Sequence, residues 1–124
     1  MAESRPPNND LERVETSNIP FALVAKACPD LGTFSQRDLR DWFDLIHAAD
    51  IVRPMLGISP HAWSEAINAM GAQNAAITLG YILQRAADIQ NPGGYLRSLT
   101  RKAQDRAFSS GPLIMALLTP QGQG

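Results

Sequence analysis

The stretch NPGGYLRSLTRKAQDRA, residues 91–107, is typical of a tight turn that leads into a short amphipathic helix. Its first four residues include one proline and two glycines, which commonly separate helices. Apolar residues then recur at helical spacing: Leu96, Leu99, Ala103 and Ala107. Basic residues fall on the other side: Arg97, Arg101, Lys102 and Arg106. The stretch therefore predicts a helix with one apolar side and one cationic side.

Helical periodicity continues along nearly the whole chain, without strand-like alternation. The sequence therefore predicts an all-α fold, a compact bundle of five to six short helices joined by tight Gly/Pro turns. The other expected helices cover residues 19–27, 36–49, 60–70, 73–89 and 113–118. A domain is expected over residues 19–118. Residues 1–18 are expected to be a disordered linker or the end of a fragment of a longer protein, and residues 119–124 a frayed tail.

The second expected helix depends on weaker local signals than the others. Residues 28–32 are expected to end the helix over residues 19–27. Ser35 is then expected to cap the second helix, with Asp38 completing an approximate capping box. The apolar positions assigned to this helix are Leu39, Trp42, Phe43, Ile46 and Ala49 or Asp50. These positions are expected to face the core.

Stronger signals mark the middle of the chain. Ser59 and Pro60 form a helix start, because serine caps and proline suits the first helical position. Trp42 and Trp63 lie on apolar stripes and are expected to anchor the core. Gly80 costs roughly 1 kcal/mol in mid-helix relative to alanine. Its presence there indicates a close approach between two helices.

Composition limits the classes of protein that this chain can represent. It has 124 residues, 44% of them hydrophobic, and a net charge of −1, as expected for one globular domain. Residues 1–70 contain six basic and ten acidic residues, a net charge of −4. Residues 71–124 contain five basic and two acidic residues, a net charge of +3. This division argues against DNA binding driven by the charge of the whole domain.

The sequence predicts a cytoplasmic protein. One cysteine, Cys28, excludes a disulfide within the chain and suits a reducing compartment, where it is expected to be a small core residue. No apolar run approaches the roughly 20 residues that a membrane span requires. The first residues, MAESRPPNND, lack the cationic start and apolar centre of a signal peptide.

No arrangement of residues predicts catalysis. His47 and His61 are the two histidines, and no further ligands cluster near them at metal-binding spacing. Gly93 and Gly94 match neither the phosphate-binding P-loop pattern nor the dinucleotide-binding pattern, so they are expected to form only a turn between helices. We therefore expect no catalytic residue, no metal, no cofactor and no small-molecule substrate.

The cationic helix is the clearest candidate for binding. Its candidate nucleic-acid contacts are Tyr95, Arg97, Arg101, Lys102 and Arg106. Three or four cations would neutralise few phosphates, and a solvated helix face has the same pattern. Tyr95 is compatible with stacking on a base and with packing in the core. Both interpretations stay open from the residues alone.

Seven short motifs give the chain a resemblance to a known family. They are ACPDL (27–31), VRPMLGISPHAW (52–63), MG (70–71), NAA (74–76), ILQRAADI (82–89), NPGGYLRSLTRKA (91–103) and FSSGPLIMALL (108–118). In this order and spacing they resemble the C-terminal region of RepC, the replication initiator of RepABC-type plasmids in alphaproteobacteria. The resemblance implies a family without catalytic activity that acts at an origin within its own coding sequence. It also implies an N-terminal winged-helix module that is not part of this chain.

The resemblance leaves the role of the C-terminal domain open. One hypothesis is a protein-interaction or self-association module in origin firing, with host replication proteins or another copy of the chain as partner. Its candidate contacts are an acidic face, Asp38, Asp41 and Asp44, and an apolar helix with Leu113, Met115 and Leu117. The alternative is an accessory module that contacts the phosphates of plasmid origin DNA through residues 95–106. A third is a helical tail that only stabilises the initiator. None of these hypotheses involves a membrane.

Overall fold

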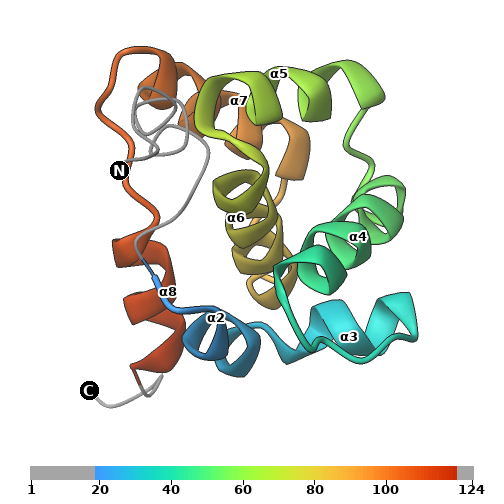
Figure 1. Cartoon of the computed structure of the whole chain (residues 1–124). Coiled ribbons are helices and arrows are strands. Elements are labelled where there is room, and N and C mark those ends of the chain that lie inside the picture. Colours follow the sequence, from blue (N-terminus) through green and yellow to red (C-terminus); the bar gives the residue numbers. More distant parts are fainter. Residues whose placement is uncertain (1–18, 120–124) are drawn as a thin grey trace, which may run out of the picture.

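A computed structural model describes residues 19–119; the expected linker (1–18) and all of the expected tail except Thr119 lie outside the described residues. The helices, in chain order, are α2 (Phe21–Ala27), α3 (Pro29–Ser35), α4 (Trp42–Val52), the 3-10 helix η1 (Arg53–Leu56), α5 (Pro60–Met70), α6 (Ala72–Gln84), α7 (Pro92–Gln104) and α8 (Gly111–Leu118). The described part of the chain contains no strand. The all-α prediction is therefore confirmed, with more helices than expected (Figure 1).

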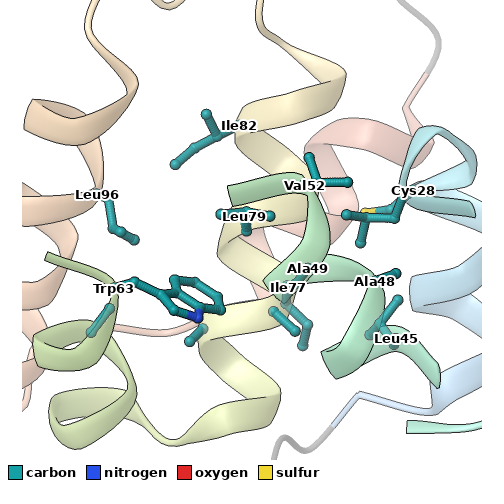
Figure 2. Packing of buried hydrophobic residues seen from close by; sticks show 14 of the residues in the cluster. Cys28, Leu45, Ala48, Ala49, Val52, Trp63, Ile77, Leu79, Ile82 and Leu96 are labelled. Carbon is teal, nitrogen blue, oxygen red and sulfur yellow. The ribbon is translucent and has the colours of Figure 1, made fainter. Parts of the chain in front are cut away.

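Helix α6 forms the centre of the bundle. It packs against α3, α4, α5, α7 and α8, and Figure 1 shows the other helices arranged around it. Its residues are buried almost without interruption: Ala75, Ala76, Ile77, Thr78, Leu79, Gly80 and Ile82. Figure 2 shows labelled core side chains from α4, α5, α6 and α7 pointing toward one another. A helix that is buried on most sides must be apolar on most sides, which explains the alanine-rich sequence.

The close approach predicted at Gly80 is confirmed. A Cβ atom added there would lie 2.8 Å from Cys28 Sγ and 3.0 Å from Leu31 Cδ1. Cys28 is fully buried, as expected of a small core residue. Burial, with a smaller contribution from Asp30, raises the pKa of its thiol to about 12. The thiol is therefore neutral and unreactive at physiological pH.

The break expected over residues 28–32 is confirmed at Cys28, where α2 ends, but is wrong beyond it, because helix α3 begins at Pro29. Pro29 lies in the first turn of α3, where the missing N–H removes no hydrogen bond, and Leu31 is buried beneath it. Ser35 is consequently the last residue of α3 and not a cap. The cap of α4 is Asp41, whose Oδ1 accepts the Asp44 N–H at 2.9 Å. Proline thus begins a helix here where it was expected to end one.

The face assigned to the second expected helix is wrong at Phe43, although Ala49 is buried and Leu39, Trp42 and Ile46 pack half-buried against the core as expected. Phe43 is 68% exposed. The residues that α4 buries are Asp44, Leu45, Ala48, Ala49 and Val52. Small alanines on this side allow α4 to pack closely on α6, which the bulkier Phe43 side would not. Trp42 is half-buried with its ring edge-on to Phe21, whereas Trp63 is buried as expected.

Most helix ends follow their local signals. The Ser59 hydroxyl accepts the Ala62 N–H at 3.1 Å, which confirms the predicted start of α5. The Asn91 side chain accepts the Gly94 N–H at 3.0 Å and so caps α7. Helix α6 ends at Gln84 and a turn follows, so the expected extension of this helix to residue 89 is wrong. This region lies at the edge of the bundle, where burial no longer favours a helix.

Candidate functional site

The cationic side of α7 faces outward as the sequence predicts. Leu96, Leu99 and Thr100 are buried on the opposite side, and α7 packs against α5 and α6. The exposed basic residues are Arg97, Arg101, Lys102 and Arg106. None of them takes part in an ion pair with another described residue. This cationic face, as we call these four residues, is therefore available to an anion.

Tyr95 combines features of the two interpretations that the sequence left open, namely stacking on a base and packing in the core. Its side chain is half-buried, and its ring stacks on that of Tyr81, with centroids 6.1 Å apart and planes at 21°. Burial, followed by the proximity of Tyr81, raises the pKa of the Tyr95 hydroxyl, so it is neutral at physiological pH. The Arg85 guanidinium lies 5.9 Å from the centre of the Tyr81 ring. Tyr95 is thus held in an aromatic pair at the base of the cationic face.

A hollow of about 300 Å³ lies between α7 and the start of α8. Its lining residues are Tyr95, Leu99, Lys102, Ala107, Phe108, Ser109, Pro112 and Leu113. We call it the α7–α8 hollow. It joins residues from the predicted nucleic-acid group with Leu113 from the predicted partner group. The α7–α8 hollow was not predicted from the sequence, although Phe108 in a Ser-Gly-Pro-rich turn is a signal of an ordered loop.

Arg106 has a backbone conformation that seldom suits arginine. Its φ angle is 61°, in the left-handed region, immediately after α7. The Ala107 N–H donates to the Lys102 carbonyl at 2.8 Å, and the Arg106 N–H donates to the Ala103 carbonyl at 3.0 Å. This hydrogen-bond pattern ends many helices and usually has glycine at the left-handed position. The fold therefore holds a cationic side chain where glycine would be favoured locally.

The three aspartates of the expected acidic face do not point to one surface. Asp44 is buried, and its carboxylate accepts the Arg40 N–H at 3.0 Å and pairs with Arg40 Nε at 3.3 Å and Arg37 Nη2 at 3.2 Å. The hydrogen bond from the Arg40 N–H, followed by those from the two guanidinium groups, lowers the Asp44 pKa. Asp41 is exposed but caps α4, and Asp38 is exposed in the preceding loop. The outward-facing acidic groups are thus Asp38 and Asp41.

The apolar residues expected on the last helix are divided in the same way. Ile114 is buried in the core, while Leu113 and Leu117 are half-buried against it. Met115 is 60% exposed. Arg85 Nη2 donates to the Ala116 carbonyl at 2.9 Å and ties α8 to the end of α6. Helix α8 therefore contributes mainly to the core, with Met115 as a large exposed apolar side chain.

A second hollow, of about 280 Å³, lies between α4 and α5. Its lining residues are Phe43, Ile46, His47, Asp50, Trp63 and Ile67. We call it the α4–α5 groove. The exposed Phe43 ring packs edge-on against His47, with centroids 5.7 Å apart. This groove was not predicted from the sequence, because Phe43 was expected to face the core.

The described residues offer no sign of a metal centre. Between residues 19 and 119, no three His, Cys, Asp or Glu side chains are placed so that they could hold an ion. His61 instead pairs with Glu65, one helical turn away, at 3.4 Å. Within the same range, no helix combines the length and apolar character needed to cross a membrane.

Comparisons with known proteins agree on the family. The family model described as the replication protein C C-terminal region matches residues 20–120. A curated protein of Rhizobium rhizogenes, provisionally named replication protein C, is 46% identical over 120 residues, which cover 94% of this chain and 30% of that protein. A protein of Sinorhizobium fredii (strain NBRC 101917 / NGR234) with the same provisional name is 38% identical over 123 residues, which cover 98% of this chain and 30% of that protein.

This chain therefore spans less than a third of the length of the curated relatives that it matches. No solved structure gives a significant match. The family that the seven sequence motifs indicated is confirmed, because a family model matches most of the chain. The chain belongs to the replication protein C family and corresponds to its C-terminal region.

Proposed function

We propose that this chain is a non-catalytic accessory domain of a plasmid replication initiator, and that it docks another protein through the α4–α5 groove during origin firing. The observation that carries the proposal is the 68% exposure of Phe43 beside the apolar floor formed by Trp63 and Ile67. Exposed apolar surface beside a hollow is typical of interaction sites. Burial of one such ring by a partner would contribute about 1.5–3 kcal/mol to binding.

The composition of the groove defines the partner's chemistry. Its apolar lining favours an apolar anchor residue, as in most interface centres. Asp50 adds a carboxylate to the rim and favours a cation beside that anchor. A host replication protein or another copy of the chain could present such a segment.

The test is a Phe43→Ser variant of the whole replication protein that contains this domain. A photo-crosslinking residue placed at position 47 reports what enters the groove, and light scattering reports self-association. Phe43→Ser should abolish the crosslinked species or the dimer. Phe34→Ser is the matched control, because Phe34 is 51% exposed on α3 and does not line the groove. Crosslinking that is unchanged in Phe43→Ser would refute the groove as the docking site.

The cationic face favours a second function, contact with the phosphates of origin DNA. Its support is the exposure of all four basic residues without an ion pair to a described residue. Such contacts give affinity with little sequence readout. Each phosphate that is neutralised steepens the dependence of log K on log salt by about 0.9. Four contacts would therefore give a slope of roughly −3 to −4.

The test of this second function is a titration of fluorescent origin DNA at several salt concentrations. Arg101→Glu should weaken binding and reduce the magnitude of the salt slope by about one or more. Lys26→Glu is the control, since Lys26 is an exposed cation on α2 and lies outside the cationic face. Equal losses in both variants would show that only net charge matters and would reject a specific DNA-facing helix.

A further inference from the structure

We propose that the α7–α8 hollow accepts one unpaired base of single-stranded DNA, whose phosphates follow the cationic face. This inference rests on the proposed DNA-contacting function and deepens it by naming the form of DNA and the site for a base. Two aromatic side chains, a cationic side chain and a hydroxyl meet in the hollow: Tyr95, Phe108, Lys102 and Ser109. Single-strand binding sites combine aromatic surfaces with cations in this way.

The size of the hollow suits one base. Its volume of about 300 Å³ is at the lower end of the range for small-molecule sites. Tyr95 and Phe108 provide aromatic surface, and Leu99 and Leu113 provide apolar contact. The stack with Tyr81 limits the motion of the Tyr95 ring before any ligand arrives, which lowers the entropy lost on binding. A base would gain stacking there without a requirement for sequence.

Charge on the rim favours a nucleic acid strand over an uncharged ligand. Lys102 belongs both to the lining and to the cationic face, so a base in the hollow places its own phosphate beside a cation. Arg101 and Arg106 are exposed near Lys102 in the chain and can meet the neighbouring phosphates. Asp105 is the acidic residue in the same turn. The local balance is therefore positive and complements a phosphodiester backbone.

The conformation of Arg106 supports the same conclusion. Its left-handed backbone lies directly before Ala107, which lines the hollow. A residue that violates a local preference is often kept for function. Glycine at this position would end α7 with less strain but would remove a cation from the rim. The fold thus maintains a positive charge next to the hollow at some local disadvantage.

A single strand fits the site better than a duplex does. Bases in a duplex are paired and stacked, so a duplex would have to extrude a base to fill the hollow. An unpaired strand can insert a base at much smaller cost. We therefore expect the chain to prefer single-stranded DNA to a duplex of the same sequence. An acidic protein segment is the competing occupant, and the experiment distinguishes it.

The experiment measures fluorescence anisotropy of three labelled probes with the 124-residue chain: a twelve-nucleotide oligothymidylate, the same strand in a duplex, and an abasic strand with the same number of phosphates. The thymidylate strand should bind about fivefold or more tightly than the abasic strand, the range expected for stacking of one base. Phe108→Ala should remove this base preference and leave abasic binding unchanged. Lys102→Ala should weaken binding of both single strands.

Controls separate folding effects from binding effects. Phe108 packs against the core, so thermal unfolding by circular dichroism accompanies each variant. Phe108→Leu retains an apolar side chain without the flat ring, and it should lose most of the base preference while remaining folded. Phe43→Ala removes an exposed ring from the α4–α5 groove and should leave all three DNA affinities unchanged.

The outcomes separate failure of the base site from failure of the phosphate-contacting function. Equal affinity for thymidylate and abasic strands would overturn the base site while the phosphate-contacting function survives. Absence of binding to all three probes would overturn both proposals. A polyglutamate peptide that displaces every probe equally, with no base preference in the wild type, would assign the hollow to an acidic protein segment. A base preference that Phe108→Leu removes would establish the base site.

Discussion

Helix α7 separates its apolar and polar residues much more clearly in the sequence than α4 does, and α7 has the predicted orientation whereas α4 departs from it at Phe43. In α7 the charged and apolar residues are segregated, so burial of Leu96 and Leu99 leaves one arrangement for the cations. In α4 apolar residues surround much of the helix, because Phe43 and Ile46 lie on one side and Leu45 and Val52 on another. When charged residues are segregated on one side, the sequence determines which face of the helix is buried. When apolar residues are distributed around the helix, the packing of the neighbouring helices determines the buried face.

The orientation of α4 in the bundle has a functional consequence. Its smaller side, with Ala48 and Ala49, packs against the central helix α6. Its bulkier side, with Phe43, forms one wall of the α4–α5 groove. A large aromatic residue is thus left exposed because close packing favoured small residues at the helix contact. The α4–α5 groove and the cationic face are both surfaces that stay exposed because the opposite side of the helix packs in the core.

The largest expected effect tests the orientation of α4 directly. Leu45→Ala should destabilise the domain by about 2–5 kcal/mol, because it removes a fully buried side chain. Phe43→Ala should change stability by no more than about 0.5 kcal/mol, because its ring is largely exposed. Urea unfolding of both variants provides the comparison. A larger loss for Phe43→Ala than for Leu45→Ala would reverse the assigned face.

The next effect tests the contact between α6 and the α2–α3 corner. Gly80→Ala should destabilise the domain by about 1–3 kcal/mol through overpacking, because the new methyl group would overlap the Cys28 sulfur. Part of this loss should be offset by the better helix propensity of alanine. In a Cys28→Ala background the same substitution should be less harmful. A double-mutant cycle from thermal unfolding measures this coupling, and strict additivity would contradict the contact.

A smaller effect distinguishes stability from function in α7. Arg106→Gly should stabilise the domain by about 1 kcal/mol, because glycine tolerates the left-handed conformation. The same variant should bind DNA more weakly through the loss of a cation. Urea unfolding and anisotropy on one protein preparation measure both quantities. Arg106→Lys retains the charge and serves as the control, with little change expected in either quantity.

The last effect appears in the acid range and concerns Asp44. Its pKa is lowered in the folded state by the Arg40 N–H and by the guanidinium groups of Arg40 and Arg37. The stabilisation is therefore present above the unfolded pKa of about 3.9 and is lost as the pH falls through the lower folded pKa. Asp44→Asn should reduce the slope of stability against pH below about pH 4. Acid titrations of stability with an unchanged slope would show that Asp44 is not linked to folding.

The class of the fold and several local structures follow from the amino-acid sequence alone. The caps at Ser59 and Asn91 form from groups within one turn of each other, so no distant contact is needed. The close approach at Gly80 was predictable because a mid-helix glycine has a clear energetic disadvantage that packing must offset. The exposure of the four residues of the cationic face followed from the high cost of burying an unpaired charge.

Which apolar surfaces stay exposed and where hollows form depend on contacts between helices that are far apart in the chain. Helix α3 exists because Leu31 packs beneath α6 at Gly80, a contact between residues far apart in the chain. Asp44 turned inward because Arg37 and Arg40 surround it, which separated it from Asp38 and Asp41. The α4–α5 groove and the α7–α8 hollow each join segments from different helices. Local sequence patterns predict which side of a helix is exposed to solvent. A site between two helices depends in addition on which helices pack against each other.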